Sequence, residues 1–148
     1  MKILVPHDGT KMSDKALKKA VELAIALKSE IILLHVVEEI PIPPTLILGN
    51  DSTLINRSKR SIRKQLERGW NKLAEVKAHE IESTKIKMND VCVYGHAADQ
   101  ILHFAKNNHI DMIIMASRRF SGVSKIKILG SVTRKVSEQA DCPVLIIH

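Results

Sequence analysis

Five short apolar runs, separated by longer segments with helical periodicity, constrain the fold of this chain more than any other feature. Four of the runs are almost continuously apolar, and they are Ile3–Pro6, Ile31–Val37, Met112–Met115 and Pro143–Ile147. A weaker fifth run lies around Val91–Tyr94. Continuous runs of this length, unlike alternating ones, are typical of parallel strands that helices cover on both faces. The sequence therefore predicts a buried parallel sheet.

Four helical patterns separate these runs. The first has Thr10 or Ser13 available as an N-cap, and its apolar positions are Leu17, Ala20, Val21, Ala24 and Leu27. The longest is predicted from about Thr53 to Glu80, with one packed side formed by Ile62, Leu66, Trp70, Leu73 and Val76. A third helix is predicted over 97–107 and a fourth from about Ser131. Alternating strands and helices in this order predict a doubly wound α/β fold with right-handed crossovers.

Length and composition predict one soluble domain with one site. The 148 residues are 45% hydrophobic and carry a formal net charge of +7, which favours anionic partners in general. No segment resembles a signal peptide and no apolar run approaches the length of a membrane span, so we expect a cytoplasmic protein without a membrane partner. Cys92 and Cys142 lie in separate apolar segments without CxxC spacing, and are predicted to be buried free thiols.

Polar residues and glycines gather where the predicted strands end. An open parallel sheet binds its ligands beyond the carboxyl ends of its strands. Asp8 follows the first strand, where it either accepts a hydrogen bond from a ribose or caps the turn into the first helix. Gly130 and Ser131 either present N–H groups and a positive dipole end to a phosphate or only start a helix. The irregular segment Glu38–Asp51 lies at the same edge, as either a lid or a connector.

The residues at this edge and in the strands resemble those of universal stress proteins. The matching blocks follow the order of that family, and they are Ile3–Thr10, Leu34–Val37, Gly95, Asp111–Arg118, Gly130–Val132 and Asp141–Ile147. The resemblance covers both ends and most of the chain. It implies a flavodoxin-like, Rossmann-like domain over residues 1–148, with five parallel strands in the order 3-2-1-4-5. It also implies a homodimer that pairs through the C-terminal strand Pro143–Ile147.

The same resemblance implies a binding site for ATP or AMP, with Mg²⁺ accompanying ATP, in a sensor or regulator of the stress response. Asp8 corresponds to the aspartate that contacts the ribose in ATP-binding members, and the backbone of Val36 corresponds to the group that reads adenine. A loop with the pattern Gly-x2-Gly-x9-Gly-Ser/Thr holds the phosphates in those members. The site residues implied here are Pro6, His7, Asp8, Val36, Met115, Ala116, Arg118, Arg119, Gly130, Ser131 and Val132.

This chain departs from the loop pattern of the family. Ala116 and Arg119 replace the first two glycines, and ten residues instead of nine separate Arg119 from Gly130. An arginine opposes close backbone approach to a phosphate or a positive φ. Two hypotheses therefore stand side by side. Either the cations of the loop, Arg118, Arg119, Lys125 and Lys127, hold phosphate oxygens by charge, or the protein is a nucleotide-independent dimeric interaction module.

Three further patterns bear on a metal site, a nucleic-acid site and catalysis, and each supports a function only weakly. His96, Asp99 and His103 fall at i, i+3 and i+7 and could share a metal ion, but such a set arises easily by chance, so no metal site is predicted. The basic segment Arg57–Lys64 has only Trp70 as an aromatic neighbour, which favours a solvated helix face over a nucleic-acid site. No catalytic motif is present, and at most Asp8 polarises a water for slow ATP hydrolysis.

Overall fold

The computed structural model describes residues 1–38, 52–117 and 129–148, excepting the side chains of 52–55. Strands and helices alternate along it as predicted. They are β1 Lys2–Pro6, α1 Lys11–Leu27, β2 Glu30–Val37, α2 Ser52–Ile81, β3 Met88–Tyr94, α3 Ala97–Asn107, β4 Met112–Ala116, α4 Ser131–Gln139 and β5 Val144–Ile147. A short 3-10 turn, Glu82–Thr84, follows α2.

The five strands form one parallel sheet in the order β3-β2-β1-β4-β5, which confirms the predicted order. Strand β1 lies at its centre, where Leu4 is in register with Ile32 of β2 and Ile113 of β4. Both termini of the chain therefore contribute to the sheet, β1 at its centre and β5 at its edge. The central strands are buried on both faces, which explains their continuous apolar runs.

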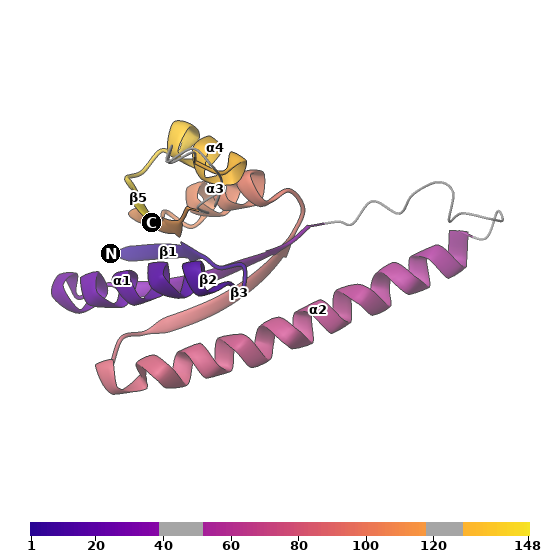
Figure 1. Ribbon diagram of the computed structural model, residues 1–148, viewed down its shortest axis with the longest axis horizontal. Helices are drawn as coiled ribbons and strands as arrows, with labels where there is room; N and C mark the ends of the chain where they lie inside the picture. Colours follow the sequence, from indigo (N-terminus) through magenta and orange to yellow (C-terminus); the bar gives the residue numbers. More distant parts are fainter. Residues whose placement is uncertain (39–51, 118–128) are drawn as a thin grey trace, which may run out of the picture.

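Helices cover both faces of the sheet (Figure 1). Ile3 and Val5 of β1 pack with α1 and α2, whereas Leu4 packs with α3 and α4. Alternate residues of one strand thus belong to two separate apolar clusters. Helix α1 begins at the predicted cap, where Thr10 Oγ1 accepts a hydrogen bond from Ser13 N at 3.3 Å. The structure selects Thr10 and not Ser13 as the N-cap.

The predicted packed side of α2 is wrong in part. Trp70 is buried and Leu73 is partly buried, but Ile62, Leu66 and Val76 are exposed. For Ile62 and Leu66 the reason is geometric, because the N-terminal part of α2 runs past the ends of the strands and has no sheet beneath it (Figure 1). Val76 lies in the packed half, but it follows the buried Ala74 by two positions and so belongs to the opposite side of the helix. Periodicity along a helix identifies an apolar row without showing how far the neighbouring sheet extends.

Two smaller expectations also need correction. Strand β3 begins at Met88, three residues before the predicted run, because the exposed Asn89 and Asp90 interrupt its apolar pattern. An edge strand tolerates such polar residues. Cys92 and Cys142 are free thiols, but they are half-buried where full burial was expected. Among the described residues, no helix combines the length and the apolar character that a bilayer crossing requires.

Candidate functional site

The predicted site residues lie where β1, β2 and β4 end and α4 begins. The end of β1 is joined to β2 by two hydrogen bonds, from His7 N to Leu34 O at 2.8 Å and from His35 Nδ1 to His7 O at 2.9 Å. The start of α4 is joined to β4 by a third, from Thr133 Oγ1 to Ala116 O at 3.2 Å. Because β1 and β4 are parallel neighbours, both groups share the carboxyl edge of the sheet. This edge holds Pro6, His7, Asp8, Val36, Met115, Ala116, Gly130, Ser131 and Val132.

Asp8 caps the turn into α1, as one of its two predicted interpretations states. Its Oδ1 accepts hydrogen bonds from Thr10 N at 3.1 Å, Thr10 Oγ1 at 2.6 Å and Ser13 Oγ at 2.9 Å. The residue itself is exposed, and Gly9 after it adopts a φ of +81° that turns the chain into the helix. The carboxylate is therefore held in a defined position at the surface of the edge.

His7 is a buried histidine with both ring nitrogens engaged. Its Nδ1 accepts a hydrogen bond from Gly9 N at 3.1 Å, so the proton of the neutral ring resides on Nε2. Nε2 donates to Asp14 Oδ1 at 3.2 Å. Burial lowers the pKa of His7, and the hydrogen bond with Asp14 opposes this shift. The neutral ring thus fastens the end of β1 to α1.

Asp14 extends this contact to the long helix. Lys77 Nζ of α2 lies 3.0 Å from Asp14 Oδ1. Desolvation raises the pKa of Asp14, but hydrogen bonds from Lys77 and His7 outweigh it and lower the pKa overall. Neither Asp14 nor Lys77 was a predicted site residue. Their partners are remote in the sequence, and no local pattern indicates such a pairing.

Trp70 of α2 contacts the two histidines at the ends of β1 and β2. Its ring stacks on His35 with centroids 4.6 Å apart and planes inclined by 10°, and its centroid lies 6.0 Å from that of His7. Trp70 Nε1 is buried without a hydrogen-bond partner among the described residues. The sequence placed Trp70 correctly in the core, but it gave no sign of the stack with His35.

The start of α4 has the form of an anion-binding helix end. Gly130 is the N-cap with φ −60° and ψ 157°, and no side chain of the described residues caps the helix there. The first helical hydrogen bond runs from Arg134 N to Gly130 O at 2.9 Å, so the preceding N–H groups have no partner within the helix. A Cβ placed on Gly130 would meet no atom of the described chain within 4 Å. The remaining predicted residues, Arg118 and Arg119, lie outside the described residues.

The ends of β2 and β3 are joined beside this edge. Gly95 N donates to Val37 O at 3.1 Å, and Glu38 Oε1 accepts from Ala97 N at 3.1 Å at the start of α3. Gly95 adopts a φ of +133°, and a Cβ there would lie 2.9 Å from Gln100 Nε2. Glycine is therefore required at position 95 for both conformation and space.

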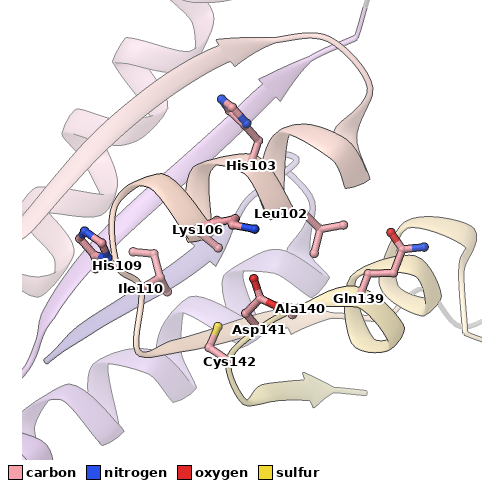
Figure 2. A pocket seen from close by; sticks show the side chains of 10 residues that line it. Leu102, His103, Lys106, His109, Ile110, Gln139, Ala140, Asp141 and Cys142 are labelled. Carbon is pink, nitrogen blue, oxygen red and sulfur yellow. The ribbon is translucent and has the colours of Figure 1, made fainter.

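Of the three residues His96, Asp99 and His103, the last two have side-chain partners in the protein. His103 Nε2 lies 2.8 Å from Asn107 Nδ2, and Asp99 Oδ1 lies 2.6 Å from Lys135 Nζ. Within the described ranges, no three His, Cys, Asp or Glu side chains come together as metal ligands. A cavity of about 490 Å³ does open between the C-terminal ends of α3 and α4, beside Lys106 and Asp141 (Figure 2). It lies where β4 and β5 begin, at the opposite edge from the predicted site.

Comparison with known proteins gives a consistent result. A family model described as the universal stress protein family matches residues 1–148. The universal stress protein YxiE of Bacillus subtilis is 32% identical over 147 residues, which cover 99% of this chain and 98% of the relative. The solved structure of MJ0577, named as a universal stress protein of Methanocaldococcus jannaschii, superposes with a TM-score of 0.79 at 28% identity, covering 99% of this chain and 94% of that one.

More distant structures share the fold and were determined with ligands. A universal stress protein in complex with cAMP is 19% identical with a TM-score of 0.64, and it covers 100% of this chain and 97% of its own. The protein from Archaeoglobus fulgidus in complex with dAMP is 18% identical with a TM-score of 0.61, and the corresponding coverages are 100% and 98%.

Proposed function

The chain belongs to the universal stress protein family, and from this premise we propose that it binds an adenine nucleotide at the carboxyl edge of its sheet. The start of α4 is the observation that carries the proposal. It combines N–H groups without helical partners with a helix N-terminus that no described side chain caps and a Gly130 that no described atom crowds. Such a helix end favours a phosphate group. Two proteins of the same fold are described with cAMP and dAMP.

The remaining residues of the edge have roles in this proposal. The exposed Asp8 carboxylate accepts hydrogen bonds from the ribose, and the backbone of Val36 reads the adenine. Pro6, His7, Met115 and Ala116 form the floor at the strand ends, while Ser131 and Val132 offer N–H groups to the phosphates. Arg118 and Arg119 supply positive charge in place of the glycines of the family pattern.

Magnesium enters this proposal only together with ATP. The described residues contain no group of three carboxylate, histidine or cysteine side chains that could hold a resident ion. Mg²⁺ binds substrate phosphates and keeps several of its waters, and Asp8 is the carboxylate nearest to the proposed site. AMP would bind without the metal. Any hydrolysis of ATP would be slow, with Asp8 polarising a water.

The proposed assembly is a cytoplasmic homodimer that acts as a sensor or regulator in the stress response. Strand β5 is an edge strand of the sheet, and Leu145 is exposed on it. An uncovered edge offers backbone N–H and C=O groups to a second strand. We therefore propose pairing through Pro143–Ile147 of two copies, with nucleotide occupancy read by protein partners.

Isothermal titration with AMP, ADP and ATP, with and without Mg²⁺, tests the proposed ligand. The wild-type protein is expected to bind at least one of the three below millimolar concentration. Gly130→Val is expected to abolish binding while leaving the thermal midpoint unchanged, because its Cβ meets no described atom. Asp8→Asn keeps an oxygen for the α1 cap and removes the charge, so it should weaken binding without unfolding the helix. Absence of binding at millimolar nucleotide overturns the proposal.

One observation favours a second function, a nucleotide-independent dimeric interaction module. Ala116 and Arg119 depart from the glycine pattern that holds phosphates in ATP-binding relatives. Native mass spectrometry of the gently purified protein separates the two functions. A dimer mass with a bound nucleotide supports the first, whereas a dimer mass without one, together with unchanged partner binding on addition of ATP, supports the second.

A further inference from the structure

Helix α2 carries an exposed apolar row in addition to the row that packs on the sheet. Trp70, Ala74 and Ile81 are buried in the core. Beside them, Ile62, Leu66 and Val76 are 42%, 41% and 54% exposed. Most of the large hydrophobic side chains of the described protein are not exposed in this way, and these three share one helix. The core of the protein therefore does not account for them.

The spacing of the row is that of a helix which contacts another helix. From Ile62 the row continues through Leu66, Gly69, Leu73 and Val76, at intervals of four, three, four and three residues. Residues at these intervals lie in line along one side of a helix and form the contact seam of paired helices. Leu73 also touches the core, so the seam lies beside the buried row. A single partner helix could lie along its length.

Gly69 in the middle of the row supports the same conclusion. Glycine in a helix interior is destabilising relative to alanine, and a Cβ at position 69 would meet no described atom within 4 Å. The described part of the chain thus gives no reason for glycine at this position. A partner helix that crosses here would use the missing side chain to bring its backbone closer.

The charges near the row indicate the kind of partner. Lys59 extends the row by one position and Lys72 flanks it, whereas Arg63 on the other flank already lies 4.9 Å from the ring centroid of Tyr94. Glu67 is the only carboxylate between residues 56 and 73, and it accepts a hydrogen bond from Tyr94. Two copies of such a surface would repel each other. Acidic side chains on the flanks of a partner helix would match it.

The spacing and Gly69 favour a helix over a membrane as the occupant. A bilayer would accept an apolar side beside cations such as Lys64 and Arg68. It has no backbone that must approach closely, however, so it gives no reason for a glycine in the middle of the row. Binding to vesicles is therefore one of the outcomes that the test distinguishes.

We propose that the exposed row of α2, Ile62, Leu66, Gly69, Leu73 and Val76, binds an amphipathic helix of a different protein with acidic flanks. The partner places apolar side chains on the row and carboxylates against Lys59 and Lys72. This binding is independent of a nucleotide, because the row and the start of α4 belong to helices on opposite faces of the sheet.

A pair of designed peptides tests this proposal. One is a 21-residue helix, about three heptads long, with leucine at its contact positions and glutamate at its flanks. The other carries lysine at the same flanks. Fluorescence anisotropy at physiological salt is expected to show binding of the glutamate peptide and none of the lysine peptide. Equal binding of both peptides, or of neither, overturns the proposal.

Variants of the protein locate the binding on the row. Ile62→Ser with Leu66→Ser is expected to weaken binding of the glutamate peptide at least tenfold, whereas Ile25→Ser, at an exposed aliphatic of α1, leaves it unchanged. Lys59→Gln with Lys72→Gln should weaken it further than Lys64→Gln with Arg68→Gln on the far side. Circular dichroism confirms that each variant is folded. Equal affinity of the wild type and the Ile62/Leu66 variant would refute the assignment.

Gly69→Ala gives a readout in which stability and binding move in opposite directions. The substitution is expected to raise the thermal midpoint and to reduce the affinity for the glutamate peptide. The Ile62/Leu66 variant also tests three other occupants of the row, namely a second copy of the protein, a membrane and a nucleic acid. If the wild type forms a dimer in sedimentation, binds phosphatidylglycerol vesicles or binds duplex DNA, and the variant loses that property, the row belongs to that occupant. Any of these results would overturn the proposal.

Discussion

At the scale of single residues, His7 illustrates how one buried side chain joins separate parts of the protein. Its carbonyl accepts from His35, its Nδ1 accepts from Gly9, and its Nε2 donates to Asp14. Of the two hydrogen bonds made by the ring, the one that Nδ1 accepts from Gly9 requires the neutral form. Protonation would remove the acceptor at Nδ1 and bury a charge between the strand end and α1.

The stability of the protein is therefore expected to fall as the pH decreases from 7.5 to 5.5. Burial lowers the pKa of His7 in the folded protein below its ordinary 6.5. As the pH falls, His7 of the unfolded chain is therefore protonated before His7 of the folded protein, and this stabilises the unfolded state. The contribution is complete above pH 6.5 and is lost below it. Thermal melts at pH 7.5, 6.5 and 5.5 measure the effect. His7→Gln, which does not titrate, should show a smaller slope, and an unchanged slope would contradict this assignment.

Glycines at two turns are expected to differ in their tolerance of a side chain. Gly95→Ala forces a residue into φ +133° and against Gln100, and should cost about 1–3 kcal/mol of the free energy of unfolding. Gly130→Ala has an ordinary φ of −60° and meets no described atom, so it should cost at most about 1 kcal/mol, the effect of a poorer N-cap residue. Urea denaturation of both variants makes the comparison, and equal losses would be inconsistent with it.

At the scale of secondary-structure elements, the two halves of α2 differ in how they pack, although the sequence shows one continuous helical pattern. Its C-terminal half packs on the sheet through Trp70, Ala74 and Ile81 and is joined to α1 through Lys77 and Asp14. Its N-terminal half runs past the strands (Figure 1), and among the described contacts Arg63 there lies 4.9 Å from the ring centroid of Tyr94. The free energy that holds α2 in place therefore comes mainly from its C-terminal half.

Substitutions in the two halves of α2 should show this division. Trp70→Ala removes a buried side chain that stacks on His35 and is expected to cost about 3–5 kcal/mol. Leu66→Ala removes an exposed side chain and should cost less than about 1 kcal/mol. Because Trp70 is the only tryptophan of the chain, unfolding in urea is followed by circular dichroism. A similar loss for both variants would mean that the N-terminal half is also packed.

At the scale of the whole molecule, the two outermost strands of the sheet, β3 and β5, differ in polarity. Strand β3 at one edge carries the exposed polar residues Asn89 and Asp90 and lies beside α2. Strand β5 at the other edge is short and apolar, with Leu145 exposed. Polar residues on an edge strand oppose pairing with another chain, whereas an apolar edge favours it.

The proposed homodimer is accordingly expected to depend on β5. Leu145→Lys places a charge on the pairing surface of both copies and should shift the protein from dimer to monomer in analytical ultracentrifugation. Asn89→Lys on β3 is the matched control and should leave the dimer intact. A wild-type monomer, or a Leu145→Lys dimer, would rule out pairing through this strand.

Local sequence patterns determined the elements of the fold and the edge at which the predicted site lies. Continuous apolar runs indicated the central strands, and Thr10 with the helical spacing after it indicated α1. The capping residues Asp8 and Thr10 interact within a few positions of each other, so their chemistry is visible in the sequence. The strand order 3-2-1-4-5 came from the resemblance to the family, and the structure confirmed it.

Only the tertiary structure decided which remote residues meet. The stack of Trp70 on His35, the contact of Lys77 with Asp14 and the division of α2 into packed and exposed rows all depend on how α2 lies against the sheet and α1. Periodicity reports the side of an element on which apolar residues lie, but it carries no information on the neighbour that covers them. That neighbour is set by the packing of whole elements, which is why these features became visible only in three dimensions.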